Sequence, residues 1–337
     1  MDHEISIKKY DNSKKSEWDD FVNSSVNGTF LQTKQFLDYH PADRFVDSSL
    51  MVYDQDKLVA VCPACIISDK GEKIFFSHKG STFGGVIIGA KQCALHKILP
   101  IISGIEEYCE SNEFSKIVLK QTSDLFCGKK SDLIDFALYY LGYIEKKELN
   151  FYIDFSQYDD KILSNFSQGK RTNINNCLKK GIEVKKINTE TQINDFYCIL
   201  CTTLEKYGKT PVHTLDELLL LKNSIIAEEV EFFGAYLENK MIAGSMMFYF
   251  RNANVAHTQY LCALPEYDTL SPMSFMYYTM IENAKRKSFD MISFGIATED
   301  EGRYINSGLA ASKEAFGAKH SVNKIYYKSL VNKGAQI

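Results

Sequence analysis

The 337-residue sequence has only 6 proline residues and a single tryptophan, whereas Tyr and Phe are abundant at 20 and 22. This composition excludes long disordered linkers. The net charge of −4 excludes a surface coated with nucleic-acid-binding charge, so we expect no DNA partner. No stretch approaches the roughly 18 uninterrupted apolar residues of a membrane span, and residues 1–5 lack the basic start of a secretion signal. We therefore expect a cytoplasmic protein without a membrane span.

Metal and disulfide chemistry are also not expected, although the chain contains nine cysteines. Cys62 and Cys65 lie in an apolar run that predicts one strand over residues 58–67, where a separation of three sends the side chains to opposite faces. Cys198 and Cys201 lie on one face of a helical pattern among apolar residues. The cysteines are therefore interpreted as reduced core residues, with no metal site.

The length predicts two domains, because 337 residues exceed what one ordinary core accommodates. The order strand, helices, strands, helix, strand, helix, strand occurs twice, which places one domain at residues 1–155 and the other at 156–337. In the second copy, residues 159–180 read as one helix and residues 324–331 as the last strand. The fold class is therefore α/β with mixed sheets.

Three local signals define the second half. Thr214 and Glu217 have the spacing of a capping box, which predicts a helix over 214–228. Residues 230–237, 241–250 and 254–262 alternate as a three-stranded meander, with turn residues between them. Ser271-Pro272 then predicts the start of a helix, with serine as N-cap and proline at the first helical position.

Lys313 is the candidate catalytic residue. If residues 306–318 form a helix, Leu309, Lys313 and Phe316 share one face, and Gly317 suits a left-handed stop. A lysine on an apolar face must snorkel, pair with an acid or hold negative charge in a cleft. The first reading is a structural one, and the last predicts a role in catalysis.

Further candidates lie in the third meander strand. His257 and Gln259 share one face, where they could line a ligand cleft, and Tyr260 lies on the other. His257 is a candidate proton acceptor and Tyr260 a candidate donor to an oxyanion. A hydrogen-bonded core histidine and a half-buried strand tyrosine explain the same pattern.

Two features suggest anion binding. The helix start at Ser271 presents a positive dipole end and backbone N–H groups. Arg171 lies in a basic stretch, where a planar guanidinium suits phosphate recognition and a solvated basic face is the alternative.

Taken together, these features resemble the tandem GNAT-like proteins of the FemABX group and the related BioF2-like acetyltransferases. The resemblance covers nearly the whole chain and is strongest in the second half. Its motifs are Gly84-Gly85, Lys170-Arg171 with Ile174 before Lys180-Gly181, Ala243-Gly244, Ser271-Pro272, Phe294-Gly295, and Asn306 with Gly308-Leu309, Lys313 and Phe316-Gly317-Ala318.

The resemblance implies two GNAT-like domains and transfer of an acyl or aminoacyl group to an amine on a cell-envelope, glycan or nucleotide-sugar precursor. It assigns Lys313 to charge stabilisation, Arg171 to an acceptor phosphate, and Asn306 and Ser271 to the substrate site. The partners it implies are a small-molecule or lipid- or nucleotide-linked glycan acceptor and a possible tRNA. No cofactor is bound tightly, and acyl-CoA or aminoacyl-tRNA is the co-substrate. We expect Lys313→Ala to lower turnover with little change in folding stability.

The sequence departs from the family pattern in two places. Ser293 stands where related families often have an acidic residue before Phe-Gly, which removes one candidate base. No glycine occurs in residues 268–272, where GNAT enzymes usually have a pyrophosphate loop. A non-catalytic GNAT-like module that binds a nucleotide-sugar or peptide is therefore the alternative function.

Overall fold

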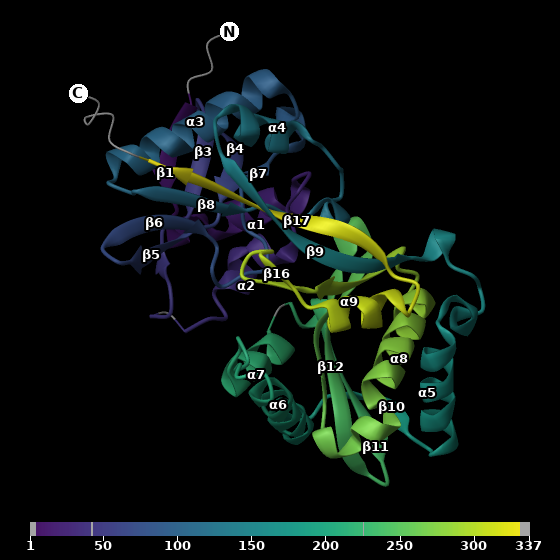
Figure 1. Cartoon of the computed structure of the whole chain (residues 1–337). Coiled ribbons are helices and arrows are strands. Elements are labelled where there is room, and N and C mark those ends of the chain that lie inside the picture. Colours follow the sequence, from purple (N-terminus) through teal and green to yellow (C-terminus); the bar gives the residue numbers. More distant parts are fainter. Residues whose placement is uncertain (1–4, 42, 225, 331–337) are drawn as a thin grey trace. The chain divides into compact units, whose positions relative to one another are not determined.

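The computed structural model describes residues 5–41, 43–224 and 226–330 (Figure 1). It divides into unit 1, residues 1–148 with 322–337, and unit 2, residues 149–321. The predicted domains were divided at 155/156 instead, with residues 322–337 in the second. The predicted strand ends at residues 4 and 331 lie outside the described residues.

Unit 1 begins with two short helices and a set of antiparallel strands, and one long helix covers its core. Its helices and strands are β1 (Ile5–Lys9), α1 (Lys15–Ser24), α2 (Lys34–Leu37), β2 (Val46–Asp47), β3 (Leu50–Asp54), β4 (Lys57–Cys62), β5 (Cys65–Asp69), β6 (Glu72–Ser77), β7 (Ile87–Ile88), α3 (Leu95–Ser111), β8 (Lys116–Lys120) and α4 (Leu133–Tyr140). Residues 322–329 of β17 (Lys319–Ser329) also belong to it.

Unit 2 is built on six strands in the order β10-β11-β12-β13-β14-β9. Its helices and strands are residues 149–154 of β9 (Ile144–Asp154), α5 (Gln168–Lys179), β10 (Glu183–Ile187), α6 (Glu190–Glu205), α7 (Leu215–Asn223), β11 (Val230–Leu237), β12 (Lys240–Phe250), β13 (Val255–Ala263), α8 (Pro272–Arg286), β14 (Met291–Ile296), β15 (Thr298–Glu299), β16 (Tyr304–Ile305) and α9 (Ser307–Glu314).

The same strand arrangement occurs in both units, as the repeated element order predicted. In unit 1, β6 and β8 are parallel and helix α3 lies between them in the chain. In unit 2, β13 and β14 are parallel and helix α8 lies between them. The antiparallel strand beside each parallel pair comes from the other half of the sequence: β17 pairs with β8, and β9 pairs with β14. This exchange explains why residues 322–337 group with unit 1.

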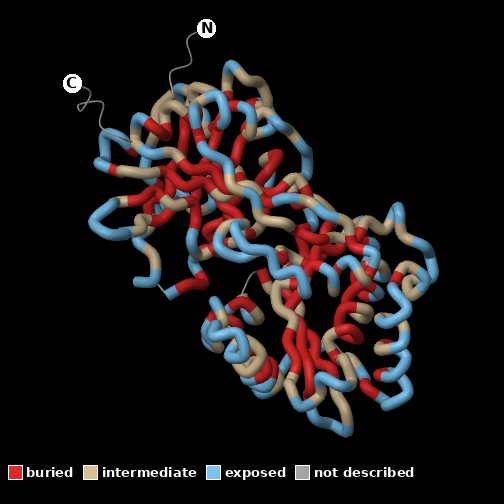
Figure 2. Tube along the Cα trace, in the orientation of Figure 1, coloured by how far each residue is buried: buried red, intermediate tan, exposed pale blue. Residues whose placement is uncertain are grey.

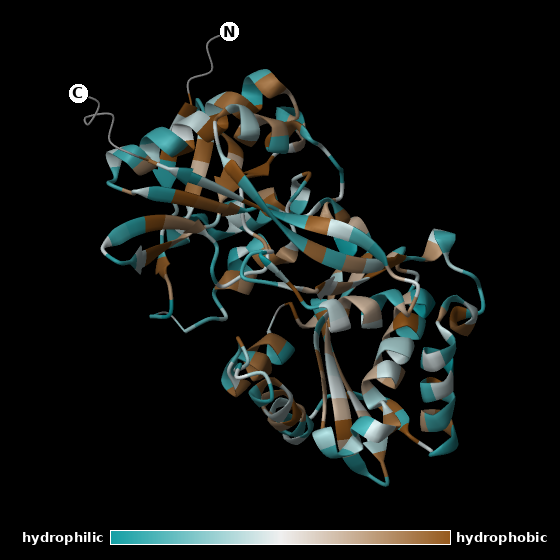
Figure 3. Ribbon diagram, viewed as in Figure 1, coloured by the Kyte–Doolittle hydropathy of each residue, from teal (hydrophilic) through white to brown (hydrophobic). Residues whose placement is uncertain are grey.

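Each unit has its own hydrophobic core. Figure 2 shows β11, β12 and β13 buried along most of their length, and α6 and α8 lie on opposite sides of these strands in Figure 1. α5 packs against α8 and presents its other side to solvent. Most of its residues are accordingly hydrophilic or neutral, as the colours of Figure 3 show. Only Ile174 and Cys177 of α5 are buried. α5 is thus an outer helix that holds its few inward residues against α8.

Two predicted elements are divided in the structure. The predicted strand over 58–67 is two strands, β4 and β5, which lie in different sheets because Pro63 and Ala64 interrupt the ladder. The predicted helix over 159–180 is a 3-10 turn, Ile162–Asn165, followed by α5. Ser167 caps α5 through its hydroxyl, so the helix begins well inside the predicted range.

The capping box and the meander are confirmed. The Thr214 hydroxyl accepts from the Glu217 N–H, and the Glu217 carboxylate accepts from the Thr214 N–H. α7 is shorter than predicted and ends at Asn223. The three meander strands pair antiparallel in sequence order, with a β-bulge beside Gln259 between β12 and β13.

Candidate active site

The parallel strands β13 and β14 of unit 2 part after a short stretch of pairing. The pairing covers Val255–His257 opposite Met291–Ser293 and stops there, although β13 continues to Ala263 and β14 to Ile296. On the other edge of β14, the register with β9 shifts between Ser293 and Gly295. Backbone and side-chain polar groups therefore gather where the two strands separate.

Lys313 of α9 reaches this place. Its ammonium Nζ donates to the carbonyl oxygens of Gly295 at 2.9 Å and Ile296 at 2.8 Å, and lies 5.6 Å from the centroid of the Phe151 ring. Lys313 is only 2% exposed and forms no ion pair with any described residue. The snorkelling alternative is wrong, because the charged end is directed at the backbone of β14 and not at solvent.

Burial without a carboxylate has a clear electrostatic consequence. Desolvation lowers the pKa of Lys313 to about 7, because the charged form loses its hydration. Near pH 7 the nitrogen is therefore present both as ammonium and as amine. With two N–H groups on carbonyl oxygens, the remaining position carries a proton in the ammonium and a lone pair in the amine. Lys313 can thus donate to or accept from a reacting group.

His257 is held beside Lys313 by a buried hydrogen-bond network. Its Nδ1 lies 3.1 Å from the Ser293 hydroxyl, which donates to Asn150 Oδ1 at 3.2 Å and accepts from the Gly295 N–H at 3.2 Å. Asn150 Nδ2 donates to the Ser321 hydroxyl at 3.0 Å. The network fixes the orientation of the His257 ring relative to β14.

The pKa of His257 is lowered to about 4, first by burial and then by the nearby Lys313 charge. His257 is therefore neutral at pH 7 and a weak base. A side-chain hydrogen bond with Gln259 raises the pKa slightly in the opposite sense. The structure thus brings Lys313, His257 and Gln259 together. The pKa of Lys313 is closer to neutral pH than that of His257.

Tyr260 is oriented by a partner from a different element. Its hydroxyl lies 2.7 Å from His213 Nδ1, at the start of α7. Burial raises the pKa of Tyr260 to about 12, so the phenol stays protonated at neutral pH and can donate. His213 is the residue that positions this hydroxyl.

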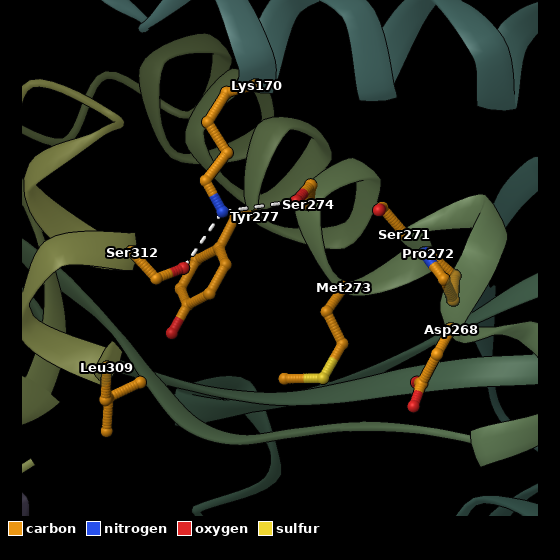
Figure 4. A pocket seen from close by; sticks show the side chains of 9 residues that line it. All are labelled: Lys170, Asp268, Ser271, Pro272, Met273, Ser274, Tyr277, Leu309 and Ser312. Atoms are coloured by element: carbon orange, nitrogen blue, oxygen red, sulfur yellow. Dashed lines mark hydrogen bonds between the residues drawn. The ribbon is translucent and has the colours of Figure 1, made fainter.

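A cavity of about 250 Å³ opens beside the start of α8 (Figure 4). Lys170 of α5 donates to the Ser312 hydroxyl at 2.9 Å and the Ser274 hydroxyl at 3.3 Å, and burial lowers its pKa. Tyr277 is only 6% exposed, and its hydroxyl has no hydrogen-bond partner among the described residues. A half-buried cation among hydroxyl groups, with no ion pair to a described residue, is suited to an oxyanion.

The backbone at the start of α8 contributes less to this cavity than the sequence suggested. The Ser271 N–H donates to Asp268 O and the Ser274 N–H to Ser271 O, both at 3.0 Å, and Pro272 has no N–H. Ser271 lines the cavity but does not cap the helix with its side chain, because it has a left-handed backbone with φ of +54°. The predicted helix start, with Ser271 at the N-cap position and Pro272 as the first helical residue, is confirmed, but side chains provide most donors to the cavity.

The remaining predicted substrate residues have local partners. Arg171 Nη1 donates to Phe166 O at 2.6 Å, while its neighbour Lys170 enters the cavity. Asn306 is the N-cap of α9, and its Oδ1 accepts from the Leu309 N–H at 3.0 Å. Gly317 follows α9 with φ of +77°, as the left-handed stop requires.

Sequence reasoning missed His213, Asn150 and Tyr277. His213 and Asn150 are far in sequence from the residues they contact, so spacing alone does not reveal them. Tyr277 looks like any apolar-face residue of a helix. In the sequence, Lys170 is only one residue of a basic stretch. Its position in the helical repeat, one residue before Arg171, was the signal that could have distinguished the directions of the two side chains.

Within residues 5–41, 43–224 and 226–330, no three His, Cys, Asp or Glu side chains are placed to hold a metal ion. The helices of this same part include none that is long and apolar enough to cross a membrane.

Comparisons with known proteins concern one segment of unit 2 and the fold of the chain. Residues 213–304 match the family model described as an acetyltransferase (GNAT) domain. No curated protein matches the chain. The matched segment contains β11 to β14 and α8, and with them His257, Gln259, Tyr260 and Tyr277.

Three solved structures cover nearly the whole chain. FemX has a TM-score of 0.68 at 13% identity, covering 95% of this chain and 96% of that chain. L-PGS from Bacillus licheniformis has a TM-score of 0.63 at 10% identity, with 96% and 93% covered. A tandem GNAT protein from the clavulanic acid biosynthesis pathway has a TM-score of 0.60 at 8% identity, with 98% and 100% covered. Residues 213–304 are therefore similar to a GNAT acetyltransferase domain, and the chain shares the fold of FemX and of the tandem GNAT protein, as its resemblance to the FemABX group predicted.

Proposed function

We propose that this protein is an N-acyltransferase that moves an acyl or aminoacyl group to an amine, with its reacting centre at Lys313 in unit 2. The observation that carries the proposal is a buried lysine that has no carboxylate partner in the part of the chain that the structure describes, held at the point where β13 and β14 part. A charge buried in this way costs folding free energy, so its retention favours a functional role over a structural one.

The chemistry requires one bond to form and one to break. The amine nitrogen attacks the acyl carbon, the C–N bond forms, and the C–S or C–O bond to the donor breaks. One proton leaves the amine and one reaches the thiolate or alkoxide that departs. Because the pKa of Lys313 is lowered to about 7, its amine form can take the first proton and its ammonium form can supply the second.

Two hydrogen-bond donors of unit 2 are assigned to stabilise the tetrahedral oxyanion. The Lys313 ammonium retains one N–H beyond those on Gly295 O and Ile296 O. The neutral Tyr260 hydroxyl is the second candidate donor. His257, with a pKa of about 4, is assigned to accepting a hydrogen bond from the incoming amine and not to holding a proton.

The donor is an acyl-CoA or an aminoacyl-tRNA, both of which carry phosphate. The cavity with Lys170, Ser274, Ser312 and Tyr277 is the candidate phosphate site. The acceptor is an amine on a cell-envelope, glycan or nucleotide-sugar precursor, in keeping with the fold shared with FemX and L-PGS.

The test is a donor screen with purified protein. Acetyl-CoA, longer acyl-CoAs and aminoacyl-tRNA are compared by thermal shift and by donor consumption with amine acceptors. We expect one donor class to raise Tm and to be consumed. Lys170→Met should raise the KM for that donor about tenfold with a smaller change in kcat, because one charge-assisted contact is lost.

Lys179→Met is the matched control, since Lys179 is exposed on the same helix. A donor that raises Tm but is never consumed would identify the non-catalytic binding module instead. If Lys170→Met leaves the KM unchanged, this cavity does not bind the donor phosphate. The proposal that the reacting centre lies at Lys313 would be unaffected by that result.

A further inference from the structure

Unit 1 contains a cavity of its own, with a volume of about 290 Å³. It is lined by side chains from the start of the chain, from α2, and from the segments around β2 and after β6. Among its lining residues are Lys34, two carboxylates, Asp38 and Asp47, and the aromatic rings of Tyr10 and Phe45. The volume is at the small end of the range for ligand pockets, about 300–1,000 Å³.

The lysine in this cavity is already fully engaged. Lys34 Nζ lies 3.1 and 3.2 Å from the two Asp47 oxygens and 2.9 Å from the Ser49 hydroxyl. It also lies 4.0 Å from the centroid of Tyr10 and 4.9 Å from that of Trp18. An incoming anion would have to displace these contacts from an ammonium that is buried under two aromatic rings. Lys34 therefore supports Asp47 and is not an anion receptor.

Two carboxylates present exposed edges to the cavity. The Asp47 side chain is 41% exposed, whereas the Lys34 side chain paired with it is only 4% exposed. The Asp38 side chain is 49% exposed, and its partner Lys15 is not among the lining residues. The two carboxylates thus have solvent-accessible edges at the cavity, whereas the ammonium of Lys34 is buried.

A second, independent feature is an unused donor. His78 is only 4% exposed, and its Nδ1 accepts from the Gly80 N–H at 3.0 Å. Burial lowers the pKa of His78 to about 3, so the ring is neutral at pH 7 and its proton is on Nε2. The Nε2–H has no hydrogen-bond partner among the described residues, and His78 belongs to the lining of the cavity.

We propose that this cavity binds a small molecule that carries a primary ammonium next to a hydroxyl or carbonyl oxygen. The ammonium is placed against Asp38 and Asp47, and the oxygen accepts from His78 Nε2–H. The aromatic faces of Tyr10 and Phe45 cover the apolar part of the ligand. The site lies wholly in unit 1 and does not depend on the acyl-transfer proposal.

The experiment compares three probes on the full-length protein: D-glucosamine, N-acetyl-D-glucosamine and inorganic phosphate. Glucosamine has the ammonium beside hydroxyl groups, and its N-acetyl derivative removes only the charge. We expect glucosamine to raise Tm and to bind at least about tenfold more tightly than the N-acetyl sugar, since charge-assisted hydrogen bonds exceed neutral ones by this order. The imidazole NMR signals of His78 should shift on binding.

Asp38→Asn should weaken glucosamine binding about tenfold without lowering Tm, because this carboxylate is exposed. Asp56→Asn, an exposed carboxylate in a turn outside the cavity, is the matched control and should leave binding unchanged. Equal affinity for the two sugars, tighter binding of phosphate, or no glucosamine binding at about 10 mM would each overturn the proposal.

Discussion

Each unit of this protein contains a lysine with a buried side chain, and the two differ in their electrostatic surroundings. Lys34 in unit 1 is 3% exposed and pairs with Asp47, whereas Lys313 in unit 2 is 2% exposed and donates to two backbone carbonyls. Burial lowers the pKa of both, but Asp47 opposes the shift at Lys34. The first lysine has its own carboxylate, and the second has none among the described residues.

The largest expected effect is on the turnover of the Lys313 variant. If the proposed function is correct, Lys313→Met should lower kcat by about 10²–10³-fold, the range for losing one preorganised transition-state donor. The folding free energy should change by less than about 1 kcal/mol, because relief of desolvation offsets two lost hydrogen bonds. Donor consumption and urea unfolding measure the two quantities. Full turnover with a large loss of stability would reverse the assignment.

Stability should respond more strongly at Lys34. Lys34→Met leaves Asp47 and Ser49 without their donor, which should cost about 1–2 kcal/mol after allowance for the partial exposure of Asp47. Lys15→Met, in an exposed pair with Asp38, should change stability by less than about 0.5 kcal/mol. Urea unfolding of both variants makes the comparison. If Lys34→Met leaves the free energy of unfolding unchanged, the Lys34–Asp47 pair does not stabilise the fold.

A third effect, visible only when the pH is changed, is a pH dependence of stability specific to Lys313. The folded state loses the Lys313 proton near pH 7, whereas the unfolded state keeps it until its ordinary value of 10.5. Between these values the unfolded state binds more protons, so the unfolding free energy rises with pH. Relative to Lys313→Met, the wild-type protein should gain about 2 kcal/mol from pH 7 to pH 9. Parallel pH profiles would mean that Lys313 stays protonated in the folded state.

Parts of this site were open to sequence reasoning because they depend on neighbours in the chain. The inward face of Lys313 follows from its spacing to Leu309 and Phe316, and the Gly317 stop follows from its freedom at positive φ. The capping box at Thr214 is likewise local. The partners of Lys313 were not accessible in this way, since Gly295 and Ile296 offer only backbone oxygens, which every residue has.

Errors arose where long-range contacts decide. Serine before proline predicts the N-cap position, but the left-handed backbone of Ser271, which leaves its side chain without a cap hydrogen bond, is not predicted by it. The basic stretch likewise does not show that Lys170 reaches Ser312 while Arg171 donates to Phe166 O, because the packing of α5 against α8 decides this. The alternation of apolar and polar residues also does not predict that β9 pairs with β14 and β17 with β8. Either antiparallel strand has the same pattern and could occupy either place.

The amino-acid sequence by itself determined the α/β class, the repeated order of helices and strands, and the inward position of Lys313, because periodicity and capping act within a few residues. Only the tertiary structure decided which strand completes each unit, and that Lys313 has no carboxylate partner among the described residues while Lys34 has one. It also decided that His213 lies against the Tyr260 hydroxyl and that Asn150 accepts from Ser293. The physical reason is that a pKa and a hydrogen bond depend on distance in space, which chain separation does not encode.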